Sequence, residues 1–392
     1  GSDPATTIID GDRQDRVLTI NGGASTVSNF TFKNGYAHVS GSTGRGDDGG
    51  GIHIENGSLV LNNSIIRDNE AADSGGAISS GQNAILNNVL IINNRSGGGA
   101  VSTDNNTVEF NQCTIVNNYG DYGIWSQNGG VIDIYNSIIF NNQGYEIETR
   151  LDESTTAAVI NVYYSNVEGG SNGINTNDYG TIDLNSCIDV DPMFVDTTNG
   201  NYHLLATSQL INAGHPDSTD SDGTVADIGA YPYLNSYGGP LWVVEESSGN
   251  DTTGTGADDN KFASIQAAIN FASDDDSVSV WPGTYYENIN ITDKNLFFKS
   301  LEGPDHLASL SPSKLKDFVK NGFKPGYQVG LKNFDKIFST YTGQFITVTG
   351  IPSSGKSDFV DQMCVGYNKN YGWKTGFASP ENTPNYLHAH KL

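Results

Sequence analysis

The sequence predicts a mainly β protein: a right-handed parallel β-helix solenoid over most of the chain, followed by a partial α/β segment. Three observations carry this prediction. Asparagine recurs every 24 or 25 residues between short apolar runs. Glycine makes up 47 of the 392 residues. The net charge changes from −28 over residues 1–300 to +3 over residues 301–392, which indicates stretches of different character.

The repeat lies in the acidic part of the chain. A coil of about 24 residues cannot bury its own apolar face, so neighbouring coils must stack. Asparagine at the bend is expected to adopt the left-handed conformation and to bond the same residue one coil away. A β-sandwich or propeller is the alternative, but neither explains asparagine at this spacing. The repeat is LNNSIIRDN (61–69), LNNVLIINN (86–94), FNQCTIVNN (110–118) and IYNSIIFNN (134–142), ending at Asn69, Asn94, Asn118 and Asn142.

These repeats resemble right-handed β-helix proteins of the pectate-lyase-like superfamily. The following YHLLATSQLINAGHPDSTDSDGTVADIGAYPY (202–233) resembles the closing segment of choice-of-anchor-type secreted proteins. Residues 1–235 are therefore expected to form a β-helix with its closing segment. The resemblance implies an extracellular or cell-surface location, with a polysaccharide or a cell surface as partner.

Residues 236–300 resemble the start of a second β-helix. A strand in LWVVEESSGND (241–251) precedes an amphipathic helix in KFASIQAAINFAS (261–273), which we expect to cover the open end of a solenoid. Further strands are expected in VSVWPGTYYENINI (278–291) and KNLFFKS (294–300). The apolar face of the helix comprises Phe262, Ile265, Ala268, Ile269 and Ala272.

The sequence of the solenoid does not single out a set of catalytic residues. A lyase needs a strong base, yet residues 34–260 contain no lysine. A glycosidase needs two carboxylates about 5–10 Å apart, for which Asp68 with Asp104 or Asp121 could be proposed. Non-enzymatic carbohydrate or surface binding is therefore favoured, with a polysaccharide lyase or glycoside hydrolase as an alternative. Surface or packing roles are expected for His38, His53, His203 and His215, which lack metal-ligand spacing.

An acidic loop offers a possible metal site. Asp217, Asp220 and Asp222 precede Gly223, and Asp227 follows. Several carboxylates in a tight loop suit Ca²⁺, which takes six to eight oxygen ligands. The loop lacks the full EF-hand pattern, and a solvated acidic turn is the alternative.

The C-terminal segment carries a phosphate-binding motif. Gly350-Ile-Pro-Ser-Ser-Gly355-Lys356-Ser357 fits G-x-x-x-x-G-K-[ST], between a predicted strand (344–349) and a predicted helix (357–370). Backbone N–H groups of this loop, which includes Ser353 and Ser354, would hold the phosphates of ATP. Lys356 would contact the terminal phosphates, and the Ser357 hydroxyl would bind Mg²⁺.

With the strand KTGFAS (374–379) and the following Glu381, residues 310–392 resemble the opening of the RecA-like ATPase domain of DnaB-like helicases, of the phage primase-helicase type. In that family a glutamate at this position activates the attacking water, which implies a catalytic Glu381. A carboxylate at a helix N-terminus is the alternative.

The two parts suggest a chimeric or truncated product. Residues 301–392 lack the later helicase elements, so we expect weak or no ATPase activity, although ATP-dependent DNA unwinding stays an alternative function. DNA is not expected as a partner, because residues 1–300 carry a net charge of −28 and would repel its phosphates. The helicase resemblance implies the cytoplasm, but an extracellular location is favoured. No apolar run is long enough to span a membrane.

Overall fold

The computed structural model describes residues 4–38, 47–150, 156–178, 180–292, 294–301, 367 and 369–371. Two compact units divide the chain: Gly1–Ser279 with Gly283–Phe298, and Val280–Pro282 with Lys299–Leu392. The predicted phosphate-binding loop at 350–357 and Glu381 lie outside the described residues. Residues 367 and 369–371 are helical, at the end of the helix predicted over 357–370.

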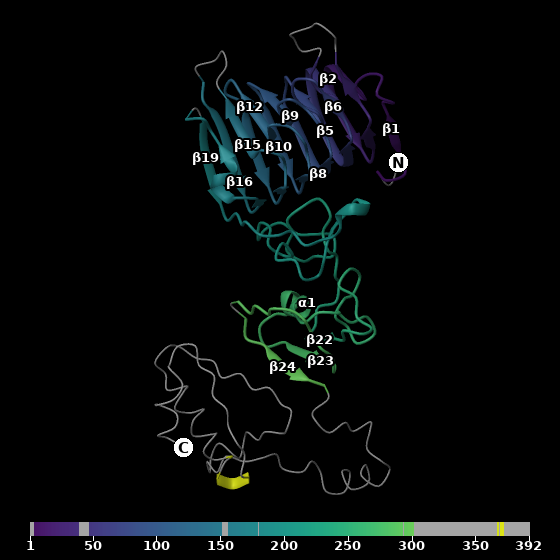
Figure 1. The fold of residues 1–392 in the computed structure, drawn as a ribbon, viewed down its shortest axis with the longest axis vertical. Helices are drawn as coiled ribbons and strands as arrows, with labels where there is room; N and C mark the ends of the chain where they lie inside the picture. The colour runs from purple at the N-terminus through teal and green to yellow at the C-terminus, as the bar shows by residue number, and fades with distance from the viewer. Residues whose placement is uncertain are drawn as a thin grey trace. The chain divides into compact units, whose positions relative to one another are not determined.

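Parallel strand pairing builds a β-solenoid in the first unit (Figure 1). Strands of successive coils stack in three ladders, as a parallel β-helix requires. The first ladder contains β2 (Leu18–Ser28), β5 (Ile52–Arg67), β7 (Ile78–Ser80), β9 (Gly99–Asp104), β12 (Tyr122–Gln127), β15 (Tyr145–Arg150) and β18 (Ile174–Asn175).

The long strands β2 and β5 bend into the second ladder, and β5 continues into the third. The second ladder adds β8 (Ala84–Ile92), β10 (Thr107–Asn111), β13 (Val131–Tyr135), β16 (Ala158–Tyr163) and β19 (Gly180–Asn185). The third combines β1 (Ile8–Asp10), β3 (Thr31–Lys33), parts of β5 and β8, β11 (Thr114–Val116), β14 (Ile138–Phe140) and β17 (Asn166–Val167). The short β4 (Tyr36–Ala37) and β6 (Glu70–Ala71) pair beside them.

Apolar columns running through the coils form the core. In the third ladder the same register position is apolar in every strand, and six of its seven side chains are completely or almost completely buried. Burial of this surface is the main term that favours stacking. The column is Ile9, Phe32, Ile66, Ile91, Ile115, Ile139 and Val167, with Ile9 exposed and Val167 buried at one end.

Side chains of the repeated asparagines form a continuous stack, as predicted. The Nδ2 of Asn69 donates to Oδ1 of Asn94 over 2.9 Å, and that of Asn94 donates to Asn118 over 3.1 Å. The stack ends with Asn118 donating to Asn142 over 2.9 Å. The predicted conformation of these residues is corrected: positive φ angles belong instead to the preceding residues, Asp68, Asn93, Asn117 and Asn141. In each of these coils, therefore, one residue makes the left-handed turn and the next residue contributes its side chain to the stack.

Beyond the solenoid, an antiparallel pair combines β20 (Phe194–Asp196) and β21 (Asn201–Leu204). The described helical segments include the 3₁₀ helices η2 (Gly170–Gly173) and η3 (Thr197–Asn199) and the α-helix α1 (Ile265–Phe271). One small sheet contains β22 (Leu241–Val244), β23 (Ser277–Val280) and β24 (Phe297–Ser300). In the part of the chain described, no helix is long and apolar enough to cross a membrane.

The amphipathic helix is confirmed in its central part: α1 covers Ile265–Phe271 of the predicted 261–273, and Ile265, Ala268 and Ile269 are buried. Phe262 is buried too, but it precedes the helix in a bridge to Val244, and the buried Ala272 is the C-cap. Contacts also cross the boundary predicted at residue 235. The Tyr233 hydroxyl donates to the Gly254 carbonyl over 2.6 Å, and its ring lies 5.4 Å from that of Phe271. The closing segment and the following strand–helix segment therefore pack on each other within one unit.

Candidate functional site

The outer face of the first ladder carries polar and aromatic side chains in register. Strand residues alternate between faces, and Ile52, Ile78 and Val101 face the core, so the residues after them face outward. Outward residues of successive strands lie about 4.8 Å apart. One outward column is His53, Ser79, Ser102, Trp125 and Glu148; a second is Asp104, Gln127 and Arg150.

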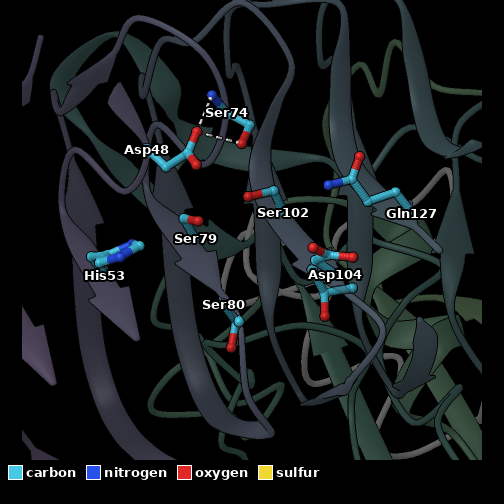
Figure 2. Close-up of a pocket in the computed structure, with 10 residues that line it drawn as sticks. Asp48, His53, Ser74, Ser79, Ser80, Ser102, Asp104 and Gln127 are labelled. Atoms are coloured by element: carbon cyan, nitrogen blue, oxygen red, sulfur yellow. Dashed lines mark hydrogen bonds between the residues drawn. The ribbon is translucent and has the colours of Figure 1, made fainter. Parts of the chain in front are cut away.

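A pocket of about 90 Å³, here called the serine pocket, opens over these columns (Figure 2). Asp48 lies at one end, where its Oδ1 accepts from the backbone N–H of Ser74 over 3.0 Å and from its hydroxyl over 2.8 Å. Asp104 lies on β9, and its Oδ1 accepts from the Asn128 amide over 3.0 Å. The labelled lining residues are Asp48, His53, Ser74, Ser79, Ser80, Ser102, Asp104 and Gln127.

Burial and negative charge characterise this face. His53, Ser79 and Ser102 are each less than 9 % exposed although they point outward. Burial raises the pKa of nearby Asp73, and the carboxylates of Asp48 and Asp47 raise it further. Hydroxyl and amide groups that both donate and accept, beside acceptor-only carboxylates, suit a ligand with many hydroxyl groups.

An aromatic surface adjoins the pocket on the next strand. Trp125 is in register with Ser102, and the Tyr122 ring lies 6.5 Å from its ring. A β-carbon added at Gly98 would lie 3.0 Å from Cε3 of Trp125. Glycine at this position therefore lets the indole ring lie against the neighbouring coil.

The predicted calcium ligands hold the backbone of the closing segment. Asp227 accepts from the N–H of Asn212 over 2.7 Å and from that of Tyr233 over 2.6 Å. Asp220 in turn accepts from the N–H of Asp227 over 2.8 Å. Asp222 accepts from the N–H of Asn235 over 2.6 Å and is also bonded by the Thr224 hydroxyl. Asp217 is exposed.

The carboxylates of Asp220, Asp222 and Asp227 accept hydrogen bonds from backbone N–H groups and do not form a cluster of metal ligands. Burial raises the pKa of Asp227 to about 7 despite its two amide donors. Within the described ranges, no three His, Cys, Asp or Glu side chains are placed to hold a metal ion. Calcium binding by this loop stays a prediction, without a ligand cluster to support it.

The carboxylates suggested for a glycosidase lie on different parts of the coil. Asp68 follows the third-ladder part of β5 and accepts from Arg67, whereas Asp104 ends the first-ladder strand β9. Only Asp104 lines the serine pocket.

Sequence reasoning missed Asp48, His53, Ser79 and Gln127 as site residues. The repeat contained a signal, because outward positions of successive first-ladder strands fall in register. That signal identifies a face of the solenoid but not the pocket, because the pocket also depends on Asp48, which precedes β5 and lies outside the strands.

Comparisons with known proteins match only a short stretch. A segment of 72 residues is 42 % identical to the Twinkle homolog protein, chloroplastic/mitochondrial, of Arabidopsis thaliana. It covers 18 % of this chain and 10 % of that protein. No family model and no solved structure matches the chain. The chain is therefore similar to a short part of the Twinkle homolog protein, over less than a fifth of its own sequence.

Proposed function

We propose that the solenoid is a non-enzymatic carbohydrate-binding protein of the extracellular space or cell surface, with the serine pocket as its binding site. The supporting observation is the row of buried, outward-facing hydroxyl, imidazole and amide groups on successive strands, flanked by Asp48 and Asp104. Such a row can bond successive hydroxyl groups along an extended glycan. Trp125 and Tyr122 add apolar surface for the C–H faces of sugar rings.

Binding is favoured over cleavage because no lysine or arginine lines the serine pocket and both of its carboxylates are held by neighbouring donors. Asp48 has one carboxylate oxygen bonded twice by Ser74, and no lysine or arginine lines the pocket. A lyase needs a base beside its substrate, and a hydrolase needs an acid with a raised pKa opposite a second carboxylate.

A glycan array probed with the full chain tests this function. We expect Gln127→Ala and Asp104→Asn to weaken binding of any retained glycan at least about tenfold, through one lost hydrogen bond each. Glu109→Gln on the second ladder is the matched control and should leave binding unchanged. Release of reducing or unsaturated sugar ends from the bound glycan would show cleavage instead and contradict the proposal.

A second activity is supported by the C-terminal motif. We infer that residues 350–357 bind ATP with Mg²⁺, because the P-loop pattern is complete and a 72-residue stretch of the chain matches the Twinkle homolog protein. Under this proposal Lys356 and Ser357 contact the phosphates and Mg²⁺, and Glu381 acts on the attacking water.

Titration of the full chain with a fluorescent ATP analogue tests nucleotide binding. Binding should require Mg²⁺ and be lost in Lys356→Ala, whereas Lys369→Ala outside the motif should bind as the wild type does. Mg²⁺-independent binding, or equal binding by both variants, would contradict a P-loop site.

A further inference from the structure

A second, larger pocket lies beside α1, within the first unit. Its volume is about 590 Å³, inside the range of about 300–1,000 Å³ typical of small-molecule sites. One wall comes from the segment around Ser208 and the other from α1 and the following residues 287–294. We call it the α1 groove.

Hydrogen bonds fix the two walls against each other. The Asn270 side-chain amide donates to the carbonyls of Ala206 over 3.0 Å and Ser208 over 3.1 Å. Within the second wall, the Gln266 side-chain amide exchanges two hydrogen bonds with the backbone of Asn290, over 2.8 and 3.1 Å, which fixes residues 287–294 against α1. The groove is thus preformed, which lowers the entropic cost of binding.

Two of the charged side chains in the groove are already neutralised by the ends of α1. Glu287 accepts from the N–H groups of Ile265 and Gln266 over 2.7 and 2.8 Å. Lys294 donates to the carbonyls of Ile269 and Asn270 over 2.9 and 2.8 Å. Because that ammonium is engaged, the groove offers no free cation to an anionic ligand.

One hydroxyl group in the groove lacks a partner. Ser264 occupies the N-cap position of α1, but its side chain makes no capping bond. Glu287 has taken the Gln266 N–H, which an N-cap serine commonly accepts from. The Ser264 Oγ is left buried without a hydrogen-bond partner, and such a group is costly unless a ligand or water completes it.

We propose that the α1 groove binds an uncharged oligosaccharide, at a site separate from the serine pocket. Gln209 and Asn288 offer further amide and carbonyl groups on opposite walls. Met193, Ile211 and Ile269 provide an aliphatic surface for the C–H faces of sugar rings. Ser264 can both donate to and accept from a sugar hydroxyl. This inference extends the proposed function to a second site but does not depend on the first.

Calorimetric titration of the full chain tests the groove, with cellohexaose, laminarihexaose and xylohexaose as probes and oligogalacturonate as the anionic comparison. We expect an uncharged hexasaccharide to bind, and Ser264→Ala and Asn288→Ala each to weaken this binding at least about tenfold. Asn172→Ala, an exposed asparagine outside the groove, is the matched control. Ser264→Ala should not lower the melting temperature, since it removes an unsatisfied buried group.

Variants of each site distinguish binding in the α1 groove from binding in the serine pocket. Binding that is lost in Asn288→Ala but retained in Asp104→Asn with Gln127→Ala assigns the groove, even if the serine pocket binds nothing. The inference would be overturned if no hexasaccharide bound at all. It would also be overturned if both groove variants bound every hexasaccharide as the wild type does. Preferential binding of oligogalacturonate would also overturn it, because the argument requires an uncharged ligand.

Discussion

The side-chain amide of Asn142 donates to a carboxylate oxygen of Glu146 over 2.6 Å, and this pair ends the asparagine stack inside the solenoid. The second oxygen of Glu146 accepts from the backbone N–H of Asn142 over 3.1 Å. Glu146 is only 3 % exposed. A titratable group therefore occupies the terminal position of an otherwise uncharged stack.

Stability should fall as pH rises through the titration of Glu146. Burial raises the pKa of Glu146 from its ordinary value of 4.5 to about 8, so the folded chain keeps this proton while the unfolded chain releases it. Between these two values the free energy of unfolding should fall by at most about 1.4 kcal/mol per pH unit. Urea denaturation at pH 5, 6, 7 and 8 measures this slope.

Glu146→Gln isolates the contribution of Glu146 from those of other groups, including Asp227, whose pKa is also raised by burial. The variant should show a shallower decline in stability between pH 5 and 8. A slope identical to that of the wild type would mean that Glu146 is ionised in the folded protein.

Asn118→Ala should strongly destabilise the solenoid. The Asn118 side chain accepts from Asn94 and donates to Asn142 and to the carbonyls of Ile91 and Val116, at 1 % exposure. Truncation leaves several buried groups unsatisfied, so we expect a loss of about 3 kcal/mol or more in the free energy of unfolding. Chemical denaturation provides the measurement.

Asn111→Ala is the matched control for that substitution. Asn111 belongs to a half-buried row on the outer face, where its amide bonds Asn87 and Glu109. Its removal should cost about 1 kcal/mol or less, because water can replace the lost bonds. Equal losses for the two variants would show that internal stacking is not the main role of these asparagines.

Asp227→Asn should loosen the closing segment. Both carboxylate oxygens of Asp227 accept backbone N–H groups, whereas an asparagine turns one acceptor into a donor that faces another donor. We expect a loss of about 1–3 kcal/mol and faster amide exchange at Asn212 or Tyr233. Asp217→Asn, on the exposed side of the same loop, should leave both measurements unchanged.

Gly144→Ala should be far more costly than Gly170→Ala. Both glycines have positive φ angles, 80° and 54°. A β-carbon at Gly144 would lie 1.8 Å from the Asp121 carbonyl oxygen, whereas none of the described atoms lies within 4 Å at Gly170. Thermal unfolding should therefore show a loss of about 1 kcal/mol at Gly170, from backbone strain alone, and at least twice that loss at Gly144. Similar losses would indicate that the coils can move apart at Gly144.

The repeat made the solenoid predictable, whereas the candidate sites were not. Matching asparagines 24 or 25 residues apart specified both the stacked coils and the bonds between them. The division of roles between Asn93 and Asn94 could not be predicted, because adjacent asparagines in a sequence give no indication of which one takes positive φ. The aspartate loop shows a similar limit: its composition suits Ca²⁺, which stays a prediction, but the hydrogen bonds from backbone amides to its carboxylates became visible only in the fold.

The sequence by itself determined the coil length, the apolar columns and the internal asparagine stack, because each depends on a period that the chain repeats. It also contained the apolar stripe of Ile265, Ala268 and Ile269, which the helix α1 brings to one face. Only the tertiary structure decided that Asp48 meets Ser74 in the serine pocket, and that Asn270 joins α1 to the segment at Ser208. Those contacts join residues outside the repeating positions, so no period in the sequence could specify them.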